Sequence, residues 1–282
     1  MAIALALVSA IVYGISDYAG GRISRRFAPV AVTLVAEVSL LLVLLVLVPL
    51  VERGAPTERA ILWGMFGGFA GSLALIGLYA TLSRGNMTVV APVTGVVSAL
   101  VPVAVGFAIG ERPEAIAVIG IGAAIVAVAL IGGLLGVAGQ HVEARTVWMA
   151  IGVGCGFGTM FVAYARAGHD AGLWPLLFSR FTGLPLVSAA FLWQHRRSGP
   201  VELGRRLFIS ATLVGLLVCL ANGTYLVAAR HGLLSVVAAV GAMYPASTIV
   251  LASTLDGERA SRSQLAGMVV AAGAVVAITI GS

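Results

Sequence analysis

Three ionisable side chains lie inside long apolar stretches of this sequence: Asp17, Glu37 and Arg180. Glu37 is the only charged residue in "VTLVAEVSLLLVLLVLV", and Arg180 lies in "WPLLFSRFTGLP". Charged groups in hydrocarbon are costly, so they pair with one another or face a polar interior. Three interpretations are open for Glu37 and Arg180: an ion pair between them, separate partners, or contact with a bound molecule. In the last case Arg180 would receive a carboxylate, and Glu37 an ammonium group or a proton.

Asp17 lies near the end of the first apolar stretch, four residues after Tyr13. This spacing puts both side chains on one face of a helix. Together they could hold a cationic or amino group. Alternatively, Asp17 lies at the membrane interface and neutralises the nearby Arg22, Arg25 and Arg26.

Hydroxyl and amide groups within apolar stretches are further candidates for a polar pocket, and they belong to Tyr79, Asn222, Tyr225 and Tyr244. Asn222 precedes Tyr225 by three residues and shares its helix face. A buried amide there needs a partner from a neighbouring helix or a bound molecule. The four histidines lie in connectors without the spacing of a zinc or catalytic site. We therefore expect no catalytic residues, no metal and no cofactor.

The composition places these side chains in a membrane protein. Of 282 residues, 60% are hydrophobic and only 10% are charged, too few to cover a soluble domain. All 17 basic residues are arginines, almost all near connectors, which indicates membrane orientation rather than nucleic-acid binding. Apolar runs of roughly 18–24 residues can each cross ~30 Å of hydrocarbon. We expect ten spans, at residues 2–21, 29–51, 60–83, 87–110, 114–136, 147–167, 172–194, 207–229, 233–255 and 263–281.

The sequence repeats itself. The segment that begins "LYATLSRG" and continues to "GERPEAIAVIG" returns as "TYLVAARHG" and "GERASRSQLAG". The matched positions are Tyr79 with Tyr225, Arg84 with Arg230, and Gly110-Glu111-Arg112 with Gly257-Glu258-Arg259. This predicts two units of five helices, residues 1–138 and 145–282. Because five is odd, the second unit must enter the membrane from the opposite side, so the fold is an all-α integral membrane protein with two inverted repeats.

These stretches, with a Pro-containing fourth span in each unit, resemble the EamA-type branch of the drug/metabolite transporter superfamily over essentially the whole chain. The resemblance implies exporters of amino acids, metabolites or drugs, with a central cavity between the halves and cytoplasmic termini. The arginine distribution over the connectors favours external termini instead. The family often carries Arg in its second helix. Here that pattern occurs at Arg180, whereas the matched position of the first repeat is Glu37.

Small residues and prolines predict how the helices pack and bend. Glycines at i, i+4 spacing let helices approach closely, and they form the pairs Gly64/Gly68, Gly67/Gly71, Gly152/Gly156 and Gly154/Gly158. Prolines inside spans leave carbonyls unbonded and can kink a helix, which would suit a gate at Pro92, Pro102 and Pro245. Glu111, Glu114 and Glu258 are expected at the membrane surface, where they cap helix starts or, as a second option, form gating salt bridges.

We therefore expect a secondary active transporter, specifically an exporter of small metabolites such as amino acids, that works by alternating access around a central cavity. The absence of a P-loop from the sequence excludes ATP hydrolysis by this chain. The expected partners are a small-molecule substrate, with proton coupling as one option, and the lipid bilayer of the inner or plasma membrane, in a monomer or homodimer. The alternatives are a channel or non-transporting membrane protein and, less favoured, an intramembrane enzyme.

Overall fold

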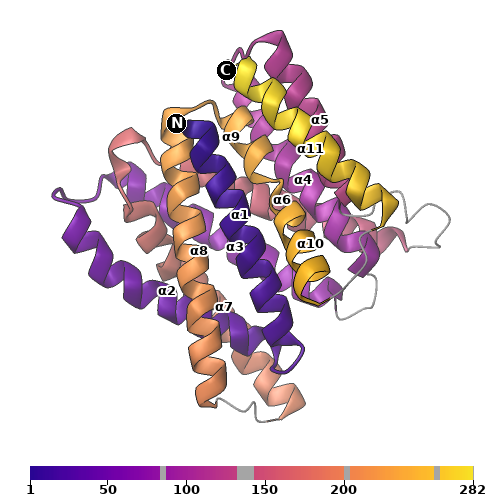
Figure 1. The fold of residues 1–282 in the computed structure, drawn as a ribbon. Coiled ribbons are helices and arrows are strands. Elements are labelled where there is room, and N and C mark those ends of the chain that lie inside the picture. Colours follow the sequence, from indigo (N-terminus) through magenta and orange to yellow (C-terminus); the bar gives the residue numbers. More distant parts are fainter. Residues whose placement is uncertain (83–86, 132–142, 200–203, 257–260, 282) are drawn as a thin grey trace.

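A computed structural model of the chain describes residues 1–82, 87–131, 143–199, 204–256 and 261–281, without the side chains of residues 79–82, 87–92 and 198. Every regular element in these ranges is a helix (Figure 1). The first repeat contains α1 (Ala2–Ser24), α2 (Pro29–Val51), α3 (Glu58–Leu82), α4 (Met87–Ala108) and α5 (Ala115–Ile131). The second contains α6 (Ala144–Arg166), the 3-10 helix η2 (His169–Ala171), α7 (Trp174–Ser198), α8 (Arg205–His231), α9 (Leu234–Gly241), α10 (Tyr244–Leu255) and α11 (Arg262–Ile280).

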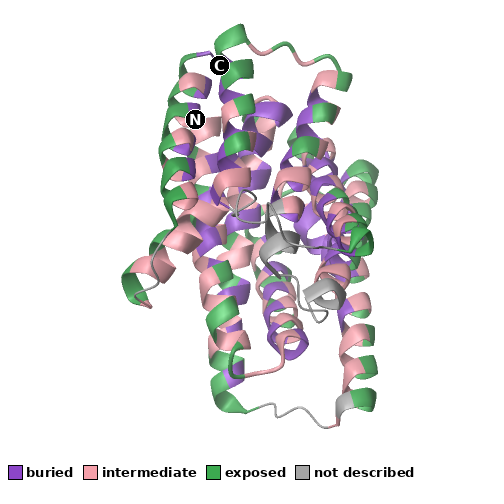
Figure 2. Ribbon diagram, turned by 90° about the vertical axis from the view of Figure 1, so that its right-hand side faces the viewer, coloured by how far each residue is buried: buried purple, intermediate pink, exposed green. Residues whose placement is uncertain are grey.

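The helices have the length and surface of membrane spans. Eight described stretches are long and apolar enough to cross a bilayer, and one of these joins α9 and α10. The shorter apolar helices Val93–Ala108 and Ala115–Ile131 occupy the fourth and fifth spans. Large hydrophobic side chains such as Leu50, Ile119 and Val269 are exposed on the outside, whereas buried residues line the helix interfaces (Figure 2). The expected all-α membrane fold is confirmed.

Local sequence explains several helix boundaries. α2, α7 and α10 each begin with a proline in the first turn, where the missing N–H is not needed. α11 begins with a capping box, in which Ser261 and Gln264 exchange side-chain and backbone hydrogen bonds.

Both termini lie at one end of the bundle, which we call the terminal face (Figure 1). There Ala2 at the start of α1 adjoins Gly232 at the end of α8, and Gly281 adjoins Ala117 at the start of α5. α1 begins at this face, whereas α6 ends there, since the Arg166 carbonyl accepts a hydrogen bond from Arg59 Nε at the start of α3. The equivalent first helices of the two repeats therefore run in opposite directions. The repeats are inverted, as the odd number of spans predicts.

The helix contacts are matched between the repeats. α1 packs on α8, and the equivalent helices α6 and α3 also pack together. In the same way, α3 packs on α7, and their equivalents α8 and α2 pack together. The contact between α4 and α6 is likewise matched by the contacts of α1 with α9 and α10. α2 contacts its own equivalent α7, and α5 contacts its equivalent α11. The two units thus interlock around a pseudo-two-fold axis, and little of the interior belongs to one repeat alone.

The predicted glycine pairs lie at these interfaces. A Cβ at Gly68 would meet the Ser179 backbone of α7, and Gly67 faces Tyr164 of α6. On α6, Gly154 and Gly158 face α4 in the same manner. The small-residue spacing therefore marks close helix packing, with the exception of Gly152, which has nothing within contact distance among the described atoms.

The ninth span is two helices rather than the single helix expected over 233–255. α9 ends at Gly241, a turn follows at Ala242 and Met243, and α10 starts at Tyr244 just before Pro245. By contrast, α4 continues through Pro102 without a break. The helix is therefore interrupted next to Pro245 and continues through Pro102, while the Pro92 side chain lies outside the described residues. The gating role of these prolines stays a prediction.

Candidate functional site

Glu37 of α2 and Arg180 of α7 form an ion pair inside the bundle. Arg180 also donates from Nε and Nη2 to Ser179 Oγ, at 3.1 and 2.9 Å, and from Nη2 to the Tyr164 hydroxyl at 3.4 Å. Ser179 in turn donates to the Leu176 carbonyl. We call Glu37, Tyr164, Ser179 and Arg180 the ion-pair cluster. Its charges cancel and its polar groups are hydrogen-bonded, as buried ions require.

The position of this cluster follows from symmetry. Glu37 and Arg180 occupy matched sequence positions in the second helix of each repeat. Two equivalent residues can contact each other only close to the axis that relates them. The ion pair therefore lies near the pseudo-two-fold axis of the bundle, where Arg180 is only 6% exposed. Of the interpretations open for these two residues, the structure shows mutual pairing.

A second polar group joins the first helices of both repeats to α8 and α10. The Tyr13 hydroxyl donates to Asn222 Oδ1 at 2.5 Å, and the Tyr13 ring lies 6.2 Å from the rings of Phe161 and Tyr244. The Phe161 ring is 4.8 Å from that of Tyr225. We call Tyr13, Phe161, Asn222, Tyr225 and Tyr244 the tyrosine cluster.

The tyrosine cluster differs from the ion-pair cluster in one respect. Tyr225 is 1% exposed, and its hydroxyl has no hydrogen-bond partner among the described residues. The Tyr225 ring lies against Gly241, at the end of α9. The Gly241 carbonyl has no helical donor, because residue 245 is a proline. An unpartnered hydroxyl and the C-terminal end of α9 thus adjoin each other in the interior.

Asp17 lies one turn beyond Tyr13 on α1, and its side chain is exposed. It does not neutralise Arg22, which pairs instead with Asp256 at the end of α10, with an N–O distance of 3.0 Å. The end of the bundle that contains Arg22 and Asp256 is called the opposite face below.

At the terminal face, two carboxylates of the first repeat cap helices of the second. Glu111 accepts hydrogen bonds from the Leu234 N–H at 2.6 Å and from the Ser235 N–H at 2.9 Å, at the start of α9. Glu52 accepts one from the Leu173 N–H at 2.7 Å, before α7. Glu111 was expected to cap a helix start at the surface, and it does so on a helix of the other repeat. Glu258 lies outside the described residues.

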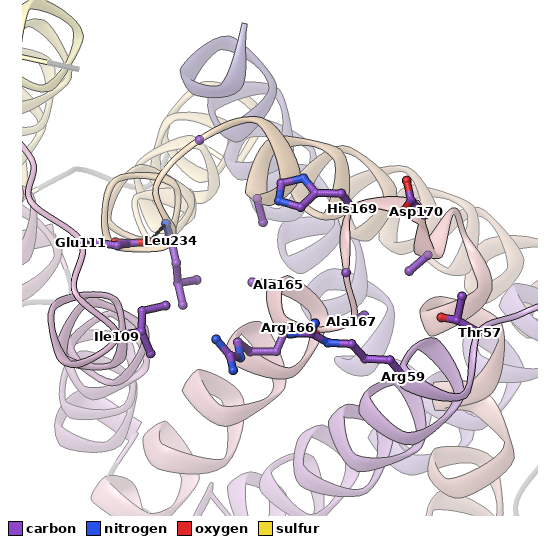
Figure 3. Close-up of a pocket in the computed structure, with 14 residues that line it drawn as sticks. Thr57, Arg59, Ile109, Glu111, Ala165, Arg166, Ala167, His169, Asp170 and Leu234 are labelled. Carbon is purple, nitrogen blue, oxygen red and sulfur yellow. Dashed lines mark hydrogen bonds between the residues drawn. The ribbon is translucent and has the colours of Figure 1, made fainter.

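A polar pocket of about 530 Å³ lies beside these caps (Figure 3). Its polar lining comes from both repeats and consists of Thr57, Arg59, Glu111, Arg166, His169 and Asp170. Positive and negative side chains are balanced, and Figure 3 shows Glu111 on one side of the pocket, Asp170 and Thr57 on the other, and Arg166 between them. The pocket therefore brings charged side chains of both repeats together at one end of the bundle.

Both repeats match one known family. The profile of the EamA-like transporter family matches residues 1–133 and 144–280. The chain belongs to the EamA-like transporter family. No curated protein matches the sequence. A crystal structure described only as that of a protein has a TM-score of 0.75 over 99% of this chain and 96% of that chain, at 14% identity. At that identity the likeness shows the fold alone.

In this EamA-like transporter, most of the candidate site residues gather near the repeat interface. Glu37 and Arg180 lie in the ion-pair cluster, and Tyr13, Asn222, Tyr225 and Tyr244 lie together in the tyrosine cluster, with Asp17 one turn away. The Tyr79 side chain lies outside the described residues. Membership of a transporter family implies a small-molecule substrate and the lipid bilayer as partners.

Four participants in these clusters and caps are not among the residues predicted from the sequence: Phe161, Tyr164, Ser179 and Glu52. Phe161 and Tyr164 share one face of α6 at a spacing of three, and Ser179 adjoins Arg180. The aromatic spacing could have pointed to the first two. Glu52 has no local signal, because its role depends on the distant start of α7.

Proposed function

We propose that this protein is a secondary carrier of small metabolites such as amino acids, which binds them at the tyrosine cluster between the repeats. The observation that carries the proposal is the break between α9 and α10 beside the unpartnered Tyr225 hydroxyl. Broken helices at a repeat interface supply backbone groups that bind substrate in inverted-repeat transporters. A hydroxyl left without a partner in that position is available to a bound molecule.

Alternating access would exchange contacts at the two faces. At the terminal face, Glu52 and Glu111 of the first repeat hold α7 and α9 of the second. At the opposite face, α10 has no buried residue, and Asp17 beside it is exposed. The caps at the terminal face and the Arg22–Asp256 ion pair at the opposite face are the contacts between the repeats that alternating access would exchange. Release of the two carboxylate caps would open the terminal face.

The export direction, the inner or plasma membrane and a proton as driving ion belong to the same proposal and follow from the family resemblance. A channel and a carrier differ in a transport experiment. A carrier exchanges bound substrate across the membrane by changing conformation, whereas a channel lets the molecule diffuse until the two sides are equal.

Counterflow tests the proposal. Purified protein is reconstituted into liposomes loaded with unlabelled amino acids, and labelled amino acid is added outside. A carrier gives transient accumulation above equilibrium, a channel gives equilibration without overshoot, and an inert protein matches empty liposomes. Tyr225→Phe should reduce the overshoot, whereas Tyr18→Phe, which removes a hydroxyl bonded to Arg22 outside the cluster, should not. Counterflow absent for every amino acid tested would contradict the amino-acid part of the proposal.

A further inference from the structure

Asp17 projects from the inward side of α1. The exposed stripe of this helix contains Ala4, Val8 and Ile11. Gly20 faces Val214 of α8, and Gly14 faces Ser247 of α10. At ~100° per residue, Asp17 points between the sides that face α8 and α10, and away from the exposed stripe.

An exposed side chain on this side of α1 requires an internal opening. α10 borders that side and has no buried residue, although every residue of α9 from Leu234 to Val240 is buried. The opening therefore lies between α1, α8 and α10, on the half of the bundle toward the opposite face. The tyrosine cluster forms its inner end, since Tyr13 and Tyr244 come from two of these helices.

The opening carries an uncompensated negative charge. Glu37 and Arg180 neutralise each other. Asp17 has no ion pair or hydrogen bond with any residue in the described part of the chain, and the nearby Arg22 pairs with Asp256. Asp17 follows Tyr13 by four residues on α1, and the Tyr13 ring lies 6.2 Å from that of Tyr244, so the carboxylate lies one turn from this pair of rings.

The neighbouring rings suit a cation as well. The rings of Tyr13 and Tyr244 are 6.2 Å apart with an interplanar angle of 49°, and Phe161 meets Tyr13 edge-on. Aromatic faces attract ammonium groups within about 6 Å of the ring centre, more strongly where water is excluded. A carboxylate ligand would instead be repelled by the unpaired charge of Asp17.

We propose that this opening binds an organic cation, an ammonium group on an aromatic or apolar body, with Asp17 as its counter-ion and the rings of Tyr13 and Tyr244 beside it. The proposal rests on the carrier function above and names the preferred class among its small metabolites: amines, whose binding an added carboxylate, as in an amino acid, weakens.

The test measures binding to the purified full-length protein by calorimetry with three probes of one shape: phenethylamine, phenylalanine and 3-phenylpropionate. Phenethylamine should bind tightest and 3-phenylpropionate weakest. Asp17→Asn should weaken phenethylamine binding roughly 30-fold or more, as loss of one partner of a desolvated charge pair does. Asp17→Glu, which keeps the carboxylate, should retain most of the affinity. Glu114→Gln, which neutralises an exposed carboxylate at the start of α5, is the matched control and should change nothing.

Tighter binding of 3-phenylpropionate, equal binding of all three probes, no binding of any probe, or an unchanged affinity in Asp17→Asn would each overturn the cation assignment. The wild-type series decides the question even where Asp17→Asn fails to fold. Counterflow of labelled phenethylamine that persists unchanged in Asp17→Asn would rule out the cation site and leave the carrier function standing. If the wild type shows no counterflow of any compound but still binds phenethylamine through Asp17, the carrier function is contradicted and the cation site stands.

Discussion

The ion-pair cluster and the tyrosine cluster lie one helical turn apart on α6, which contributes Tyr164 to the first and Phe161 to the second. Both are buried between the repeats, but they differ in whether their polar groups have hydrogen-bond partners. In the ion-pair cluster Arg180 bonds to Glu37, Ser179 and Tyr164. In the tyrosine cluster the Tyr225 hydroxyl is unpartnered and adjoins an interrupted helix.

This difference indicates a structural role for the ion-pair cluster and a binding role for the tyrosine cluster. A buried polar network in which each member is satisfied rigidifies the fold, whereas each unsatisfied group destabilises it. The ion-pair cluster therefore pins α2 to α7 near the pseudo-two-fold axis. In the tyrosine cluster the unpartnered Tyr225 hydroxyl lowers the stability of the fold, and a bound molecule that hydrogen-bonds to it would restore that stability.

The largest effect is expected from Arg180→Ala. It leaves Glu37 buried without its counter-charge, which costs about 3–5 kcal/mol of folding free energy. Chemical unfolding of the purified protein in detergent measures it. A loss below about 1 kcal/mol would show that the ion pair is not structural and would erase the contrast between the clusters.

Replacing both partners sharpens the same point. Glu37→Leu together with Arg180→Met removes both charges at similar volume, and such replacements are often neutral for stability. We expect the double variant to unfold closer to the wild type than Arg180→Ala does, in the same unfolding assay. If its amino-acid counterflow is also retained, the pair acts in structure alone; loss of counterflow in a stable double variant would assign the pair to substrate handling.

The carboxylate caps at the terminal face resemble the ion-pair cluster, because their polar groups are also hydrogen-bonded. Glu111→Ala leaves the N–H groups of Leu234 and Ser235 without their acceptor, and loss of a helix cap costs about 1–2 kcal/mol. Thermal unfolding should show this loss. Glu114→Ala is the control and should be close to zero, because the exposed Glu114 side chain has no hydrogen bond or ion pair among the described residues. Equal melting temperatures for the two variants would mean that the cap does not hold α9.

The smallest and most direct test is the same change made in both clusters. Tyr164→Phe removes a hydroxyl bonded to Ser179 and Arg180, and should destabilise the protein by about 1 kcal/mol. Tyr225→Phe removes an unpartnered buried hydroxyl and should leave stability unchanged or raise it by about 1 kcal/mol. Paired unfolding curves compare them. The contrast fails if both changes destabilise equally.

Much of the fold was predictable because the bilayer imposes simple rules. Span length follows from hydrocarbon thickness, so the apolar runs located the helices to within a few residues. Local sequence did not decide where a span is interrupted. Pro102 and Pro245 look alike in sequence, yet only the second lies at a break. Pro245 lies in the first turn of α10, where a proline is tolerated because its missing N–H is not needed. Pro102 lies in the middle of α4, where it removes one backbone hydrogen bond, and the packing of α4 on α6 can offset that loss.

The sequence by itself determined the membrane class, the two units and their inversion, because composition, span length and an odd helix number each constrain the chain before it packs. Only the tertiary structure decided which residues meet. That Glu37 reaches Arg180, that Glu111 caps α9 and that Asp17 faces inward all depend on contacts between residues far apart in the chain. Such contacts are set by how whole helices pack and rotate against one another, and local spacing cannot encode that rotation.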